Sequence, residues 1–140
     1  MSDEQQATPT MTIVVGWSPD EYGEAALARA VEEARQRSGR VVVVNATRGD
    51  ALVDERYADE DQLARLAAEL GGTGVEVDVR RSMGADVGDQ VLSVAGEVSA
   101  DLIVIGLRRR SPVGKLLMGS VAQRILLGAE CAVLAVKPPH

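Results

Sequence analysis

Two hydrophobic periodicities alternate along this chain. Short runs rich in β-branched residues have the length of single strands and lie at 12–16, 41–46, 75–80, 101–105 and 132–136. The first, second and fourth runs are apolar throughout around residues 13, 42 and 103, which is typical of parallel strands that are covered on both faces. The third run, Val75–Arg80, alternates apolar with charged residues. That alternation predicts an edge strand with one face in water.

Segments with helical periodicity separate these runs. Gly39 is expected to end the first helix, Gly71-Gly72 the second, and Asp86 is expected to cap the start of the third. A fourth, shorter helix is predicted over Ser120–Leu127. Apolar residues recur at three- and four-residue intervals, so each of the first three helices has one apolar stripe. The stripes are Leu27, Ala30, Val31 and Ala34; Leu63, Leu66, Ala67 and Leu70; and Val87, Val91, Val94, Ala95 and Val98.

The regular alternation of strands and helices predicts a single doubly wound α/β domain. No linker or internal repeat interrupts it, so the strands should be parallel, joined by right-handed crossovers, with helices on both faces. The winding of such a sheet reverses once, and ligands bind beyond the carboxyl ends of the strands at that point. The polar, acidic residues 1–10 are expected to form a disordered leader before a domain at 11–140.

Composition narrows the functional classes. A net charge of −6 and an aromatic content of 2% argue against a general nucleic-acid binder. The one histidine, His140, is the last residue, which argues against a histidine triad or a histidine metal cluster. The single Cys131 excludes an internal disulfide, fits a cytoplasmic protein and is expected to be a small core side chain. No apolar run approaches the ~20 residues that a membrane span needs.

The loop from Gly106 to Ser120 has the chemistry of an anion site. Gly106 follows the fourth strand, Gly119 precedes the fourth helix, and Gly114 lies between them. A helix N-terminus offers unpaired N–H donors and a partial positive charge, and glycine lets a phosphate approach the backbone. The basic run Arg108–Arg110 can pair with that phosphate. The alternative is a plain helix start beside a solvated basic surface.

The same loop carries a family resemblance. The spacing from Gly106 to Gly119-Ser120, followed by an amphipathic helix and the strand CAVLAV, resembles the signature of the universal stress protein family. The similarity extends from Thr12 to Lys137. It implies a five-stranded doubly wound sheet in the order 3-2-1-4-5, of the adenine-nucleotide α-hydrolase-like type, and usually a homodimer. One branch of that family binds ATP, and magnesium would enter only with the ATP.

The resemblance also implies which residues would hold the nucleotide. The glycines and the start of the fourth helix would contact phosphates and ribose. The loop after the first strand would line the adenine or ribose pocket, and the ends of the second and third strands would approach the nucleotide. The candidates are Gly16, Trp17, Ser18, Asn45, Met83, Gly84, Gly106, Arg108, Arg109, Gly114, Gly119, Ser120 and Val121.

Several candidates have a second interpretation. Arg109 stands where the family has its second glycine, so its side chain either clashes with the nucleotide or pairs with phosphate. Ser18 stands where the family has an acidic residue, and Ser18 followed by Pro19 also has the sequence of a capped helix start. Asn45 can satisfy a loop backbone instead of an adenine edge, and Gly84 can be a turn residue.

Two functional hypotheses follow from these features. The first is a dimeric stress-response protein that binds ATP or a related adenine nucleotide at Gly106–Ser120 and pairs through the apolar edge strand Ala132–Val136. The loop contains no general base, so any ATP hydrolysis is expected to be slow, and no catalytic or metal-binding residue is assigned. The alternative is a nucleotide-free interaction protein whose Arg108–Arg110 loop docks an acidic partner. Neither nucleic acid nor a membrane is expected as a partner.

Overall fold

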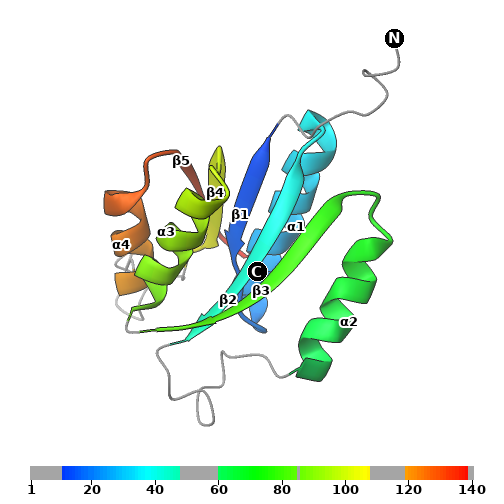
Figure 1. The fold of residues 1–140 in the computed structure, drawn as a ribbon, viewed down its shortest axis with the longest axis horizontal. Coiled ribbons are helices and arrows are strands. Elements are labelled where there is room, and N and C mark those ends of the chain that lie inside the picture. Colours follow the sequence, from blue (N-terminus) through cyan, green and yellow to red (C-terminus); the bar gives the residue numbers. More distant parts are fainter. Residues whose placement is uncertain (1–10, 48–59, 85, 108–118, 139–140) are drawn as a thin grey trace.

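Five parallel strands form one sheet in the order β3-β2-β1-β4-β5 (Figure 1). The computed structural model describes residues 11–47, 60–84, 86–107 and 119–138. None of the helices in these ranges is long and apolar enough to cross a membrane. In chain order the elements are β1 (Thr12–Gly16), α1 (Glu21–Arg37), β2 (Arg40–Thr47), α2 (Glu60–Gly71), β3 (Glu76–Met83), α3 (Val87–Glu97), β4 (Leu102–Gly106), α4 (Ser120–Gly128) and β5 (Ala132–Val136).

Two hydrophobic cores cover the two faces of the sheet. Helices α1 and α2 pack on one face, and α3 and α4 pack on the other (Figure 1). In the central strand β1, Ile13 and Val15 belong to the first core, whereas Val14 belongs to the second. All three side chains are fully buried. The continuous apolar runs are therefore confirmed as strands that lie between two helical layers.

The two edges of the sheet differ in chemistry. On β3, Glu76 and Asp78 are exposed, while Val77 and Val79 pack against the core under α2. Arg80 follows on the same strand and forms ion pairs with Asp78 at 2.9 Å and with Glu97 of α3 at 3.3 Å. At the other edge, β5 has the sequence AVLAV and is exposed or half-buried along its whole length. The prediction of an edge strand with a wet face at residues 75–80 is confirmed.

Helix α2 covers less of the sheet than its sequence indicates. Leu66 and Leu70 are buried, but Ala67, which the predicted stripe includes, is exposed. The prediction for Ala67 is wrong because α2 packs against the edge strand β3, and a helix at an edge buries a narrower stripe than one over the centre.

The ends of α1 and α3 follow their sequences only in part. Asp86 caps α3 as predicted, and its side chain accepts a hydrogen bond from the backbone N–H of Asp89 at 2.8 Å. Helix α1 ends at Arg37, two residues before the predicted glycine, because Ser38 takes the left-handed conformation with φ of 55°. Gly39 is needed for a different reason: a β-carbon there would lie 2.8 Å from the carbonyl oxygen of Met11.

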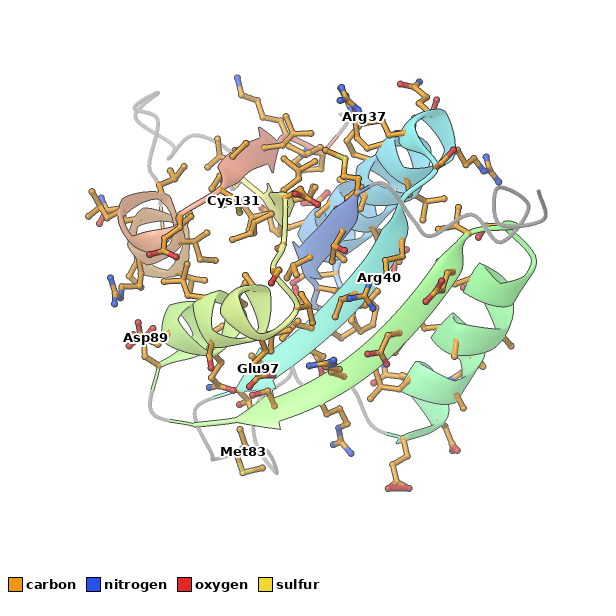
Figure 2. All side chains as sticks on the ribbon, turned by 45° about the horizontal axis from the view of Figure 1, so that its top comes forward. Arg37, Arg40, Met83, Asp89, Glu97 and Cys131 are labelled. Carbon is orange, nitrogen blue, oxygen red and sulfur yellow. The ribbon has the colours of Figure 1, made fainter. Side chains whose placement is uncertain are left out.

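Cys131 lies just before β5, on the side of the sheet that carries α4 (Figure 2). It is half-buried and packs against the core under α3 and α4. Burial raises the pKa of its thiol, which keeps the group protonated at neutral pH. Its position agrees with the prediction of a small core side chain.

Candidate functional site

A cavity of about 270 Å³ opens at the carboxyl ends of β1 and β4. These neighbouring strands mark the point where the winding reverses, since the chain continues from β1 to β2 and β3 on one side and from β4 to β5 on the other. Open α/β sheets bind their ligands at this point. The wall of the cavity also includes the loop after β1, the start of α1, and parts of β2, α3 and α4.

Seven of the predicted nucleotide-binding residues line this cavity. They come from three separate segments, which the fold brings together at one end of the sheet. Arg108, Arg109 and Gly114 lie outside the described residues, so their predicted contacts stay predictions. The seven are Gly16, Trp17, Ser18, Gly106, Gly119, Ser120 and Val121.

Three other candidates lie outside the wall of the cavity. Asn45 is fully buried, and its Nδ2 donates to the carbonyl oxygen of Trp17 at 3.0 Å, which is the structural alternative that its sequence position left open. The backbone N–H of Gly84 donates to the carbonyl oxygen of Thr47 at 3.0 Å, as expected of a turn residue. Met83 is exposed at the carboxyl end of β3 and points away from the sheet (Figure 2).

Helix α4 begins at the cavity, and no side chain among the described residues caps its first turn. Its N-cap residue is Gly119, and the first hydrogen bond of the helix runs from Gln123 N to Gly119 O at 3.0 Å. By contrast, α1 and α3 are each capped by an aspartate, Asp20 and Asp86. The leading N–H groups of a helix have no partner inside the helix and carry its partial positive charge. The start of α4 therefore offers an anion site at the cavity.

The cap of α1 is Asp20, and the prediction that Ser18 caps this helix is wrong. Oδ1 of Asp20 accepts hydrogen bonds from the backbone N–H groups of Tyr22 at 3.1 Å and Gly23 at 2.9 Å. The hydroxyl of Ser18 donates instead to Oδ2 of Asp20 at 3.0 Å. Aspartate and serine are equally good capping residues, and Asp20 lies directly before the first turn. Both side chains belong to residues that line the cavity.

Trp17 connects the cavity to the core. Only 6% of its surface is exposed, and it packs with the core under α1 while also lining the cavity. Its indole N–H donates to Glu24 of α1 at 3.3 Å, and its backbone N–H donates to the carbonyl oxygen of Val44 at 2.9 Å. These bonds hold the loop after β1 against the end of β2.

The wall includes residues that the sequence does not assign to a site. Val44 and Ala46 continue the face of β2 that begins with Val42, so the two-residue period of a strand was the signal that could have found them. Asp20 and Tyr22 also line the cavity, and neither of them is assigned to the site from the sequence. Their position beside the cavity depends on how α1 packs against the sheet, and the local sequence contains little information on that packing.

The comparisons with known proteins agree along nearly the whole chain. The model of the universal stress protein family matches residues 9–137. A universal stress protein of Mycolicibacterium smegmatis is 47% identical over 126 residues, which cover 90% of this chain and 97% of that protein. This chain belongs to the universal stress protein family. The resemblance that the Gly106–Ser120 spacing indicates is therefore confirmed.

Two solved universal stress proteins share the fold and contain an adenine nucleotide. One, from Archaeoglobus fulgidus, is in complex with dAMP; it is 30% identical, has a TM-score of 0.68, and the match covers 93% of this chain and all of that one. The other is in complex with cAMP; it is 25% identical, has a TM-score of 0.70, and the match covers 94% and 100% of the two chains. The sheet is thus the adenine-nucleotide α-hydrolase-like type, in the strand order that the resemblance implies.

Proposed function

We propose that this universal stress protein binds ATP or a related adenine nucleotide as a binding or regulatory module. The site is the cavity at the start of α4, where the Gly106–Ser120 loop begins and ends. The observation that carries the proposal is the first turn of α4, where the N-cap Gly119 has no side chain to accept hydrogen bonds from the leading N–H groups. A phosphate group would accept these hydrogen bonds instead. The dAMP and cAMP complexes of related proteins support the same class of ligand.

The rest of the cavity suits a nucleobase and a sugar. Val44, Ala46, Val87 and Val91 supply aliphatic surface from β2 and α3. Small-molecule sites generally combine a mostly apolar wall with a few polar groups that orient the ligand. In this cavity the polar groups lie at the start of α1 and at the start of α4, so the ligand would be oriented by its two polar ends.

The site is proposed to bind its ligand without efficient catalysis. No histidine or lysine is found among the described residues of the wall, and the carboxylate of Asp20 is engaged through Oδ1 in the cap of α1 and through Oδ2 in the hydrogen bond from Ser18. A general base needs an accessible lone pair beside the attacking water, so ATP hydrolysis is expected to be slow. The described residues contain no group of three metal-binding side chains. Magnesium would therefore enter on the phosphates of ATP.

Gly119 provides a test that separates binding from folding. A β-carbon at this position would meet no atom of the described residues within 4 Å, and its φ of −67° suits any residue. Aspartate is a strong N-cap, so Gly119→Asp should leave stability unchanged or raise it by a few tenths of a kcal/mol. Its carboxylate would occupy the phosphate position, and nucleotide affinity should fall at least about tenfold. Gly119→Asn caps the helix without the charge and should retain more of the affinity.

The measurement is calorimetric titration of nucleotide-stripped protein with ATP, AMP and cAMP, together with mass spectrometry of compounds that co-purify with it. Saturable binding that Gly119→Asp abolishes would support the proposal. Absence of heat and of a thermal shift at millimolar nucleotide would overturn it and favour the docking of an acidic partner by Arg108–Arg110. Equal affinity of wild type and Gly119→Asp would exclude the start of α4 as the phosphate site.

A further inference from the structure

Helices α3 and α4 both begin at the cavity and lie side by side (Figure 1). Val87 and Val91 of α3 supply part of the aliphatic wall, and Ser120 opens α4 at the proposed phosphate site. Among the described elements, α3 is the one that α4 packs against most closely. The spacing of these two helices therefore sets the distance between two walls of the cavity.

Two glycines, one on each helix, lie where α3 and α4 meet. A β-carbon on Gly88 of α3 would lie 2.9 Å from both Cβ and Cγ of Arg124 on α4. One turn further along both helices, a β-carbon on Gly128 of α4 would lie 2.7 Å from Cδ1 of Leu92 on α3. The distance between packed helices depends on the side chains at their contact, and glycine allows the closest approach. The contact at Gly88 is the nearer one to the cavity, since Val87 lines it.

The two contacts differ in what would have to move if a methyl group were added. Cδ1 of Leu92 is the far end of a flexible side chain, so a rotamer change can take it out of the way. Cβ of Arg124 has no such freedom, because it moves only with the backbone of α4. Ordinary contacts between carbon atoms begin at about 3.4 Å, so a methyl group at Gly88 would drive the two helix starts about 0.5 Å apart.

An ion pair crosses the same contact but adds little to it. Nε of Arg124 donates to Oδ1 of Asp89 at 2.6 Å, and Asp89 stands at the end of α3 that lies beside α4 (Figure 2). The two side chains are 50% and 54% exposed, and exposed pairs contribute little to stability. The spacing of the helices therefore depends on the small size of Gly88 and not on this charge pair.

Building on the proposed function, we infer that Gly88 is a positioning residue for the bound nucleotide. It brings the start of α4 close enough to α3 for one ligand to contact both helices, with its phosphate on the N–H groups after Gly119. A hydrogen bond of about 2.9 Å that is stretched by about 0.5 Å leaves the range in which such bonds occur. A methyl group at Gly88 should therefore reduce nucleotide affinity, although Gly88 itself is outside the described wall of the cavity.

The test compares three glycine-to-alanine variants by calorimetric titration of nucleotide-stripped protein with ATP. Gly88→Ala should bind ATP roughly tenfold more weakly than wild type, as expected for the loss of about one hydrogen bond to a charged group. Gly128→Ala makes the same change where the α3–α4 contact is further from the cavity. Gly96→Ala makes it on α3 where a β-carbon would meet no described atom within 4 Å. Both controls should bind ATP within about twofold of wild type.

A compensating substitution keeps the inference testable if Gly88→Ala does not fold, and urea unfolding of each variant reports whether it does. Arg124→Gly removes both atoms that a methyl group at Gly88 would meet, so the double variant should bind ATP within about threefold of wild type. The inference is overturned if Gly88→Ala binds ATP as tightly as wild type, if Gly128→Ala loses as much affinity, or if the double variant recovers neither folding nor affinity. If wild type binds no ATP, the proposed function itself fails, which is a separate outcome.

Discussion

Gly106, at the end of β4, lies against the backbone carbonyl of Tyr22 in the first turn of α1, so closely that a β-carbon at 106 would collide with that oxygen. This glycine belongs to the motif that resembles a phosphate loop, but the contact with α1 requires it even without a ligand. One residue thus serves the packing of the helix and the shape of the cavity.

The first prediction follows from this contact. Gly106→Ala should lower the free energy of unfolding by about 1–3 kcal/mol, because overpacking forces the start of α1 away from the sheet. Gly16 is the matched control at the end of β1, since a β-carbon there would make only ordinary contacts at 3.7 Å. Urea unfolding should find Gly16→Ala much closer to wild type. Equal destabilisation of the two variants would contradict the prediction.

Gln90 of α3 is expected to be replaceable by methionine without loss of stability. Its side chain is 9% exposed, and its Nε2 donates to the carbonyl oxygen of Thr47 at 2.7 Å. Within the described part of the chain, its Oε1 is a buried atom without a hydrogen-bond partner. Because Gly84 N also donates to Thr47 O, Gln90→Met leaves that carbonyl paired and removes the unsatisfied oxygen. Thermal unfolding should show stability unchanged or raised by up to about 1 kcal/mol; a clear loss would show that the amide is needed.

Acid stability should depend on Glu33. This side chain accepts hydrogen bonds from Arg29 at 3.0 Å and Arg37 at 3.2 Å, and the bond from Arg29 is the main reason why the pKa of Glu33 is lowered. A carboxyl with a lowered pKa stabilises the fold above its unfolded pKa, and the contribution is lost as pH falls through the folded pKa. Glu33→Gln should therefore lose less stability than wild type between about pH 5 and pH 3.

The control for this pH dependence is Glu32→Gln, which changes an exposed neighbour on the same helix. Urea unfolding at several pH values should give it the slope of wild type. If Glu33→Gln also retains the wild-type slope, the two arginines do not stabilise the ionised form of Glu33 in solution.

A homodimer through β5 is the fourth prediction, and Ala135 is its probe. The carbonyl oxygen of Val136 accepts from Leu107 N at 2.7 Å, so it points toward β4. Backbone direction alternates along a strand, which turns the N–H and carbonyl of Ala135 to the free edge. Ala135→Pro removes that N–H without disturbing the ladder to β4 and should produce a folded monomer. Sedimentation of wild type as a monomer at micromolar concentration would refute the dimer.

The central strands could be predicted from the sequence because a continuous apolar run indicates a strand that is covered by helices on both faces. Val14, Val42 and Ile103 each have apolar residues on both sides in the sequence, and each is fully buried between two helical layers. The exact end of α1 is less predictable. The left-handed residue is Ser38 and not a glycine, whereas Gly39 is required by its close contact with Met11, which is distant in sequence. Local signals of this kind identify a helix end to within a residue or two.

The candidate site shows the same limit. Ser18 and Asp20 are both good capping residues two positions apart, and only the entry of α1 decides which one caps. The spacing of the glycines and the predicted helix start identified Gly106 and Gly119 as parts of the cavity wall, because both signals depend on the local backbone. The side chains that complete the wall from β2 and α1 meet through tertiary packing, and no local motif indicates them.

The contrast between the two sheet edges sets a limit on the growth of any assembly. If β5 of one molecule could add to β3 of the next, each addition would expose a new β5 and a fibre would lengthen without end. The charges of Glu76 and Asp78 on β3 oppose such a head-to-tail contact. Pairing of β5 with another β5 instead leaves β3 at both outer ends of the joined sheet. The charged edge strand β3 therefore stops the growth of such an assembly, while the apolar edge strand β5 stays available for pairing.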